Sequence, residues 1–273
     1  MKSVLSSILA ALAAIVLLSP TAADARPLDE IIKSGFMRVG VHPNGPPRSS
    51  YNAKGELEGY DVDIADEICE ILGVKCEYVP TETPQRIPNL IADRTDIQLG
   101  ALTRKPSRMA VIDYSVPLHT ESMATLTTKE YAEKNNIKSH MDLGKAGARV
   151  VDCRGCNPGL WAEANIPGIK MLWVDASVDA VRAVAQGRAD AIIENLDFYM
   201  VFTEKYPDVN WHVLPAIIKT AYCGIGVAKG NDTVRHWLNS ALFQLQEENH
   251  HEEAWKKWFG SYQVAPVVPQ PYW

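Results

Sequence analysis

Residues 84–115, PQRIPNLIADRTDIQLGALTRKPSRMAVIDYS, decide the fold of this chain. Residues 86–93 carry apolar side chains at helical spacing and predict a short helix. Residues 95–99 predict a buried strand, after which a turn of small and hydroxyl residues leads into a helix that carries Arg108. Such a turn offers free backbone N–H groups, and the guanidinium can bind a carboxylate through two hydrogen bonds. The pattern indicates an anion site, although an ordinary helix-strand-helix unit with a surface arginine also fits it.

Further motifs follow one another along the chain between about residues 27 and 260. In the first stretch they are Ile87-Pro88-Asn89-Leu90, Thr95-Asp96, Gly100-Ala101-Leu102-Thr103, Lys105-Pro106-Ser107-Arg108 and Asp113-Tyr114-Ser115. Elsewhere they include Gly59-Tyr60-Asp61-Val62-Asp63, Gly187-Arg188-Ala189-Asp190-Ala191, Tyr222-Cys223-Gly224-Ile225-Gly226 and Trp255-Lys256-Lys257-Trp258-Phe259-Gly260. In this order the motifs resemble those of the type 3 periplasmic solute-binding proteins, which deliver amino acids to ABC importers.

Strand and helix signals alternate along the chain, which predicts the α/β class. The expected strands are residues 36–41, 75–79, 149–152, 170–174 and 189–194, and the expected helices are residues 61–72, 160–165, 178–186, 233–249 and 252–259. The resemblance implies the two-lobed, type II periplasmic binding protein fold, with the lobes joined by two hinge crossovers and the ligand in the cleft. Its lobe 1 is expected in residues 26–120 plus 218–273 and its lobe 2 in residues 121–217.

The first 25 residues are typical of a signal peptide. Lys2 supplies the positive n-region, residues 4–18 an apolar stretch of about 15 residues, and Ala23-Asp24-Ala25 an A-x-A cleavage site. The apolar stretch is shorter than a membrane span. We expect cleavage after about Ala25 and a periplasmic location.

The chain contains five cysteines, which in an exported protein can form disulfides. Cys69 and Cys76 flank a predicted helix-to-strand turn, and some members of the resembled family carry a disulfide there, so we expect one here. Cys153 and Cys156 form a C-x-x-C, which suits redox chemistry or half a zinc site. Because no second C-x-x-C or nearby histidine pair completes a zinc set, a local disulfide or two free thiols are favoured. Cys223, in an apolar strand, is expected to be a buried free thiol.

Composition excludes several other classes of protein. The net charge is −6 and the isoelectric point about 5.7, and no basic stripe with interleaved aromatic residues is present. We therefore expect no nucleic-acid partner. His250 and His251 are neighbours on a predicted helix and point apart, which favours a solvated helix face over a metal site. We expect neither a metal nor a cofactor.

The resemblance implies a set of ligand-binding residues. Arg108 matches the family arginine that binds the ligand carboxylate, and Ala101 and Thr103 match the turn that adds backbone and hydroxyl hydrogen bonds. From the second lobe, Cys156 and Asn157 occupy the place where backbone N–H groups at a helix start meet the same carboxylate. The threonine hydroxyls usual at that place are absent.

Other positions depart from the family pattern. Asn195, flanked by Glu194, stands where an aspartate usually binds the ligand ammonium, and an amide lacks the charge that strengthens this contact. The aromatic residue that commonly stacks on the ligand is missing near Gly45. Arg86 stands where relatives that bind acidic amino acids place a second arginine, and Arg48 falls near another wall of the cleft. These departures together favour an anionic ligand.

The sequence thus predicts a monomeric periplasmic substrate-binding protein that captures a small carboxylate-bearing solute for an ABC importer. The solute is an amino acid or a related compound, with an acidic ligand favoured by the arginines. Binding would shift the protein from an open to a closed form. One alternative is an enzyme of the same fold resembling cyclohexadienyl dehydratase, with Glu194 as the candidate general acid. Another is a ligand-sensing partner of a membrane receptor.

Overall fold

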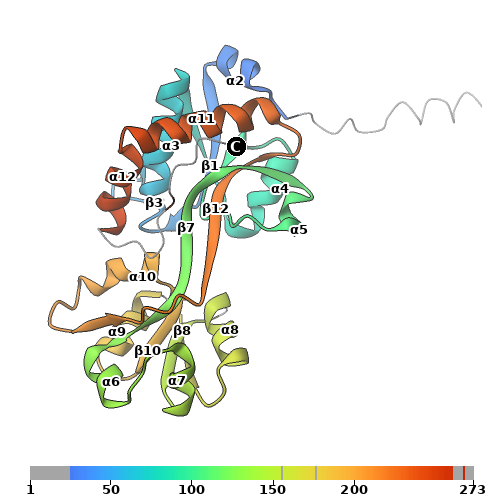
Figure 1. The fold of residues 1–273 in the computed structure, drawn as a ribbon. Coiled ribbons are helices and arrows are strands. Elements are labelled where there is room, and N and C mark those ends of the chain that lie inside the picture. The colour runs from blue at the N-terminus through green and yellow to red at the C-terminus, as the bar shows by residue number, and fades with distance from the viewer. Residues whose placement is uncertain (1–24, 155, 176, 261–266, 268–273) are drawn as a thin grey trace, which may run out of the picture.

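The computed structural model describes residues 25–154, 156–175, 177–260 and 267. The expected signal peptide therefore lies outside the described residues, apart from Ala25. Figure 1 shows two lobes joined by two long strands, β7 (Ile112–Thr128) and β12 (Lys219–Ala228). The predicted α/β fold with two lobes and two connecting segments is confirmed. Among the described residues, no helix combines the length and apolar character that a membrane span requires.

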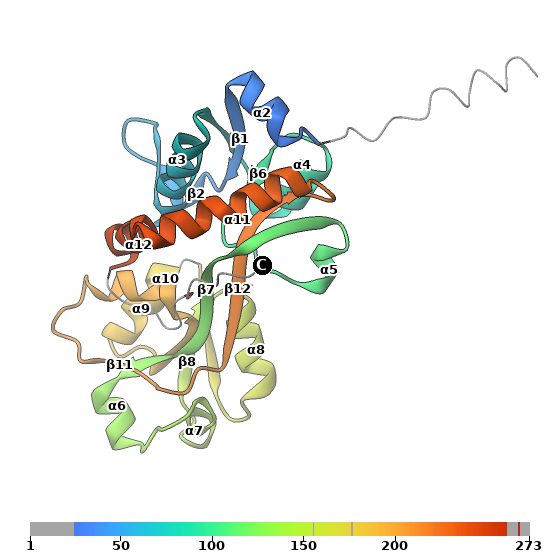
Figure 2. The same cartoon turned by 45° about the horizontal axis from the view of Figure 1, so that its top comes forward.

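The first lobe is built on the strands at one end of a nine-stranded sheet, in the order β5-β1-β6-β12-β7. A small antiparallel sheet of β2, β3 and β4 lies beside it. Figure 2 shows α11 crossing this lobe, where its buried residues join those of α3 and α12 in one apolar core. The elements are α2 (Leu28–Ser34), β1 (Phe36–Val41), β2 (Asn44–Gly45), β3 (Ser49–Tyr51), β4 (Leu57–Glu58), α3 (Tyr60–Leu72), β5 (Lys75–Pro80), the 3-10 turn η1 (Thr83–Gln85), α4 (Arg86–Ile91), β6 (Ile97–Gln98), α5 (Pro106–Met109), α11 (Asp232–Glu247) and α12 (His250–Phe259).

The second lobe continues the same sheet in the order β7-β10-β8-β9, with β11 also paired to β7. Apolar residues cover both faces of these strands: α6, α7 and α8 contribute to one core, and α9 and α10 contribute to the other. Burial on both faces explains the continuous apolar runs in β8 and β10. The elements are α6 (Lys129–Lys134), α7 (His140–Lys145), β8 (Arg149–Cys153), α8 (Asn157–Asn165), β9 (Lys170–Val174), α9 (Ser177–Ala185), β10 (Ala191–Asn195), α10 (Leu196–Thr203) and β11 (Trp211–Val213).

The two lobes share the antiparallel ladder between β7 and β12. The ladder is irregular at Gly224, where the register shifts twice opposite Pro117. A proline donates no backbone hydrogen bond, and a side chain at Gly224 would crowd the Ser115 carbonyl at 3.1 Å. The ladder is therefore interrupted on the first-lobe side of the cleft, which Pro117 lines.

Several elements differ from the sequence-based expectation. The expected crossover at residues 121–127 is part of the 17-residue strand β7, which starts in the first lobe. The strand expected at residues 95–99 is reduced to β6, although all five positions are buried. Helix α8 begins three residues earlier than residue 160 because Pro158, whose fixed φ suits a first helical turn, lies at its start. Helix boundaries are set by such local caps more than by apolar spacing.

Two disulfides are present among the described cysteines. Cys69 at the end of α3 is bonded to Cys76 in β5, with the Cα atoms 5.8 Å apart, as the resemblance implied. Cys153 and Cys156 form the second disulfide, which agrees with one of the two states favoured from sequence. Cys223 is free and buried, as expected.

Replacing Cys69 and Cys76 together by alanine should lower the free energy of unfolding by about 2 to 3 kcal/mol, because the disulfide restricts a short loop of the unfolded chain. Urea denaturation of the oxidised proteins measures this difference. The same disulfide lies far from the cleft described below, so ligand affinity of the double variant should match that of the wild type. An unchanged unfolding midpoint would contradict the structural role.

Candidate functional site

A cleft of about 1430 Å³ lies between the lobes and is the candidate ligand site. Residues of the first lobe, of both hinge strands and of the second lobe line it. Of the residues predicted from sequence, five line the cleft, namely Thr103, Cys156, Asn157, Glu194 and Asn195. The other four, Ala101, Arg108, Arg86 and Arg48, are not among the lining residues, and their contacts are described below.

The turn after β6 presents Thr103 to the cleft. Ala101 adopts a left-handed conformation with φ 55°, an arrangement that is uncommon for a residue with a side chain and often marks functional turns. Arg108 donates from Nη1 to the Thr103 carbonyl at 3.1 Å, and the Tyr114 hydroxyl donates to the same oxygen at 3.2 Å. The predicted arginine therefore lies directly behind the turn that faces the ligand site.

Arg86 supports this turn from its other end. Its guanidinium donates to the Gly100 carbonyl and to the Thr83 hydroxyl, the latter at 2.9 Å. These contacts are made with the protein's own groups. Burial lowers the pKa of Arg86, opposed by the negative charge of Asp61. The described contacts of Arg86 thus fix the turn rather than extend into the cleft.

Arg48 lies behind the hinge side of the cleft, with 11% of its side chain exposed. It donates to Nε2 of His119 at 2.9 Å and lies 3.7 Å from the Glu121 carboxylate and 3.9 Å from that of Asp61. Burial raises the pKa of Asp61 to about 6, and Arg48 opposes this increase. Burial and Arg48 together lower the pKa of His119 well below its usual value, so this ring accepts the hydrogen bond in its neutral form. The cluster places one cation among several buried acids.

The start of α8 differs from the expected arrangement of backbone donors. The Cys156 N–H donates to the Cys153 carbonyl at 3.0 Å, and the Gly159 N–H donates to the Asp152 carboxylate at 2.7 Å. Pro158 has no N–H. The prediction that the Cys156 N–H meets the ligand is therefore not supported by its observed partner. Cys156 is nevertheless one of the residues that line the cleft.

Glu194 brings a buried acid to the second-lobe wall. Its side chain comes from the end of β10, and only 7% of the residue is exposed. Burial, and then the charge of the neighbouring Asp152, raise the pKa of Glu194 well above its usual value. The strand does not point Glu194 away from the cleft. Protonation of the Glu194–Asp152 pair is therefore favoured relative to that of two exposed carboxyl groups.

Most of the other lining residues were not identified from sequence, among them Glu121, Tyr222, Trp161 and the cations Arg104, Lys105 and Lys219. Glu121 and Tyr222 come from the hinge strands β7 and β12, and Trp161 comes from α8. Glu121 is the one charged residue in residues 114–128, an otherwise apolar and hydroxyl-rich strand, and this isolation was a usable signal. Trp161 gives the second-lobe wall of the cleft an aromatic residue.

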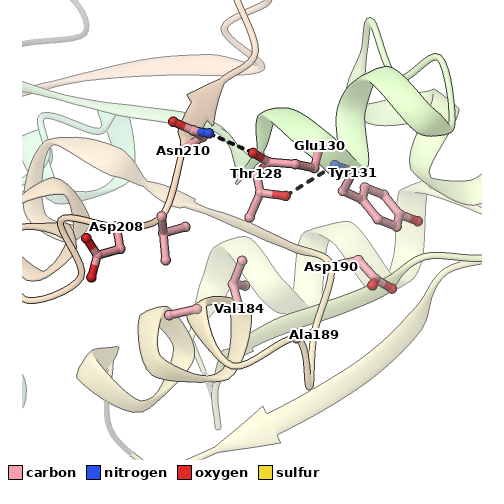
Figure 3. Close-up of a pocket in the computed structure, with 11 residues that line it drawn as sticks. Thr128, Glu130, Tyr131, Val184, Ala189, Asp190, Asp208 and Asn210 are labelled. Carbon is pink, nitrogen blue, oxygen red and sulfur yellow. Dashed lines mark hydrogen bonds between the residues drawn. The ribbon is translucent and has the colours of Figure 1, made fainter.

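A second, smaller hollow of about 350 Å³ lies in the second lobe (Figure 3). Asn210 donates to Glu130 across it at 2.7 Å, and the Thr128 hydroxyl caps α6 by accepting from the Tyr131 N–H at 3.2 Å. Asp190, on its edge, binds Arg149 through two charge-assisted hydrogen bonds. Its polar groups hold the lobe together, so we assign no ligand to it.

Comparison with known proteins adds relatives of stated function. The chain is 25% identical to the L-cystine-binding protein TcyJ of Escherichia coli over 239 residues, which cover 88% of each chain. It is 27% identical to the L-arginine-binding protein of Pseudomonas aeruginosa over 261 residues, 93% of this chain and 95% of the relative. A cyclohexadienyl dehydratase of Pseudomonas aeruginosa is 26% identical over 185 residues, 67% of this chain and 68% of that enzyme.

A similar solved structure and a matching family model agree with these relatives. An ancestral cationic amino acid solute-binding protein has a similar structure, with a TM-score of 0.77 and 30% identity over 85% of this chain and 99% of that one. The family model for bacterial extracellular solute-binding proteins, family 3, matches residues 37–261. This chain therefore belongs to family 3 of the bacterial extracellular solute-binding proteins.

Proposed function

We propose that this protein is the periplasmic substrate-binding subunit of an ABC importer and that it captures an amino acid or a close relative. The relatives with cystine-binding and arginine-binding names support this class of ligand. The ligand carboxylate binds near the Thr103 turn and Arg108, and the ligand ammonium binds near Glu194 and Asn195. The lobes close over the ligand by bending at the hinge strands.

The observation that carries the proposal is that opposite charges occur in one cleft. The cations Arg104, Lys105 and Lys219 line the cleft, and the acids Glu121 and Glu194 line it on the hinge and in the second lobe. Arg108 supports the Thr103 turn from behind. A zwitterionic amino acid carries both complementary groups within one small molecule. Because the walls belong to different lobes, such a ligand stabilises the closed form over the open form.

The contacts of the two other arginines bear on the charge of the ligand. Arg86 binds Gly100 and Thr83, and Arg48 binds His119 beside Asp61 and Glu121. Neither lines the cleft, so these two arginines give no support to an acidic ligand. Two carboxyl groups, Glu121 and Glu194, line the cleft together with the cations Arg104, Lys105 and Lys219. This arrangement suits a ligand that carries both a carboxylate and an ammonium group.

A binding panel tests the proposal. Thermal shift followed by calorimetry is carried out with neutral, cationic, acidic and sulfur-containing amino acids, and with succinate as a dicarboxylate that has no ammonium group. At least one amino acid should bind at micromolar concentration or below, and succinate should not bind. Binding of succinate alone would overturn the zwitterion assignment, and binding of no amino acid would overturn the proposed ligand class.

A second candidate function rests on the state of Glu194. Burial raises the pKa of Glu194 well above its usual value, which suits a general acid. One relative is named cyclohexadienyl dehydratase. Incubation with prephenate and detection of phenylpyruvate separates the two functions. Turnover that is lost in Glu194→Gln would establish an enzyme, and stable binding without turnover favours the import role.

Arg108→Ala should abolish measurable binding of the amino acid found by the panel. The substitution removes a charge-assisted contact to the carboxylate and releases the Thr103 carbonyl, a loss of roughly 2 to 5 kcal/mol. Arg94→Ala is the matched control, because Arg94 is exposed and does not line the cleft. Calorimetry on both folded variants measures the effect, and equal affinities would contradict the role of Arg108.

Ligand binding should release a proton from the Glu194–Asp152 pair. An ammonium group favours ionised Glu194 and lowers its pKa, so affinity should rise with pH by up to about tenfold per unit below the pKa of Glu194 in the free protein. Calorimetry in buffers of different ionisation enthalpy counts the released proton. Glu194→Gln should bind more weakly, without proton release, and its affinity should lose this pH dependence. A wild-type protein that releases no proton would refute the assignment.

A further inference from the structure

The Cys153–Cys156 disulfide lies at the wall of the ligand cleft, and its two cysteines differ in their access to the cleft. Cys156 lines the cleft, whereas Cys153, at the end of β8, is 7% exposed. A thiol that enters the cleft therefore reaches the sulfur of Cys156 and leaves Cys153 as the departing sulfur. This asymmetry determines which sulfur is attacked in thiol–disulfide exchange.

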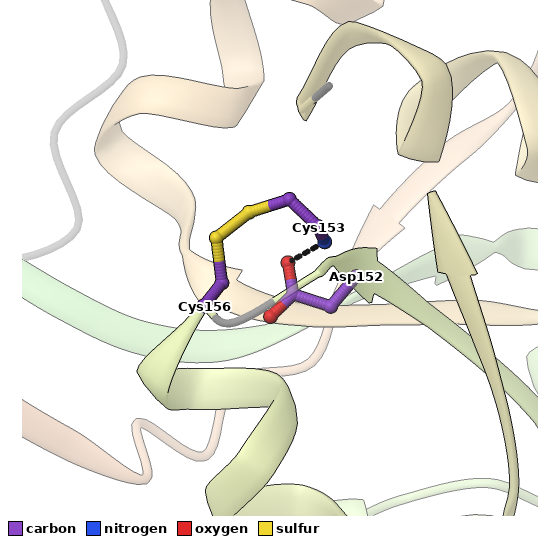
Figure 4. A group of neighbouring side chains, drawn as sticks. All are labelled: Asp152, Cys153 and Cys156. Carbon is purple, nitrogen blue, oxygen red and sulfur yellow. Dashed lines mark hydrogen bonds between the residues drawn. A yellow bond between two sulfur atoms is a disulfide. The ribbon is translucent and has the colours of Figure 1, made fainter. Parts of the chain in front are cut away.

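Groups that can stabilise or protonate a thiolate lie next to the departing sulfur of Cys153. Figure 4 shows the Asp152 carboxylate beside both cysteines, and one carboxylate oxygen and the two sulfur atoms lie within 4.8 Å of one another. The Tyr199 hydroxyl lies 3.1 Å from the same carboxylate and 3.6 Å from the Cys153 sulfur. A leaving thiolate at Cys153 thus has a hydroxyl donor and an acidic group at hand.

Glu194 supplies the second, independent observation. This cleft-lining residue is more than nine-tenths buried, and its Oε2 has no hydrogen-bond partner among the described residues. Burial raises the pKa of both Glu194 and Asp152. The charge of Asp152 raises the pKa of Glu194 further, whereas the hydrogen bond with Glu194 lowers that of Asp152. Two carboxyl groups with raised pKa values thus lie next to the disulfide. The charge of Glu121 on the hinge also raises the pKa of Glu194. Arg154, which follows Cys153 in the chain, forms an exposed ion pair with Asp175.

We propose that Cys153–Cys156 is an exchange centre that captures a small thiol covalently in the cleft. The sulfur of the bound thiol attacks Sγ of Cys156, a ligand–Cys156 disulfide forms, and the bond between Cys153 and Cys156 breaks. The electron pair of that bond stays on Cys153. The carboxyl pair gives its proton to Cys153 and takes the proton of the incoming thiol. One thiol and one disulfide are consumed and one of each is formed, so no further oxidant is required.

Attack by Cys153 on the mixed disulfide reverses the capture. The thiol is then released and the protein disulfide is restored. The cleft therefore retains a thiol for longer than an isosteric hydroxyl compound, although both bind through the same carboxylate contacts. The inference rests on the proposed function in taking this cleft as the place where a carboxylate-bearing ligand binds.

The Cys69–Cys76 disulfide provides an internal comparison. It joins α3 to β5 beside the first-lobe core, and both its cysteines pack there. Among the described residues, no carboxylate or histidine forms a comparable cluster with these two sulfurs. Exchange assisted by the protein should therefore occur at Cys156 and not at this second disulfide.

The test uses the oxidised, exported form of the whole protein with L-cysteine under anaerobic conditions. Free thiols are blocked with N-ethylmaleimide at successive times, and the peptides are mapped by mass spectrometry. Cysteine should appear on Cys156 and maleimide on Cys153, while Cys69–Cys76 stays intact. The rate should saturate with L-cysteine concentration, and cysteamine, which lacks the carboxylate, should react at least about tenfold more slowly at equal concentration.

Variants identify the role of each group. Cys153→Ser, offered L-cystine, should accumulate the Cys156 mixed disulfide, because the sulfur that reverses capture is gone. Cys156→Ser should leave Cys153 unmodified by L-cystine. Glu194→Gln should slow exchange about tenfold or more and alter its pH profile, a readout that does not depend on the stability of the cysteine variants.

Distinct outcomes overturn the inference. These are modification of Cys153, reduction of both disulfides at the same rate, or equal non-saturating rates for L-cysteine and cysteamine. Calorimetry of the same oxidised protein with sulfur-free amino acids separately tests the proposed function. Amino-acid binding without exchange at Cys156 would refute this inference alone, and selective exchange without any amino-acid binding would refute the proposed function alone.

Discussion

The antiparallel pairing of β7 with β12 is the constraint on which the rest of this structure depends. Both strands extend through the two lobes, and the ladder between them fixes the floor of the cleft, including Glu121 and Tyr222. The Thr103 turn is tied to the same ladder by a bridge to Cys223. Within this ladder the register shifts at Gly224, opposite Pro117, while pairing continues on both sides of the irregularity. The same two strands therefore position lining residues of both lobes.

Burial affects the pKa of both cleft acids, Glu121 and Glu194, in the same direction, but their neighbours affect it in opposite directions. Burial raises the pKa of Glu121 and of Glu194. Arg48, behind the hinge, draws the pKa of Glu121 back down, whereas Asp152 raises that of Glu194 further. The neighbours of the two acids thus act in opposite directions: Arg48 favours the ionised form of Glu121, and Asp152 favours the protonated form of Glu194.

Much of this fold could be predicted from sequence because it depends on local patterns. Apolar spacing located α3, α9 and α11, and buried runs located β1, β8 and β10 to within a few residues. The partners of single side chains could not be predicted in this way. The Arg86 guanidinium binds Gly100, 14 residues away, and the Cys156 N–H turns back to Cys153. Those choices depend on tertiary packing and on competing local acceptors, which an isolated sequence does not reveal.

The position of β12 within the sheet has a consequence for how the chain folds. This strand lies between β6 and β7, yet it follows both in sequence by about a hundred residues, after the whole second lobe. During synthesis the strands of the second lobe, β7 to β11, all precede β12, so this lobe can complete its sheet first. Until β12 is synthesised, the first-lobe sheet lacks the strand that lies between β6 and β7. Such late, long-range closure raises contact order and slows folding, and exposes the edges of β6 and β7 to unwanted pairing in the meantime.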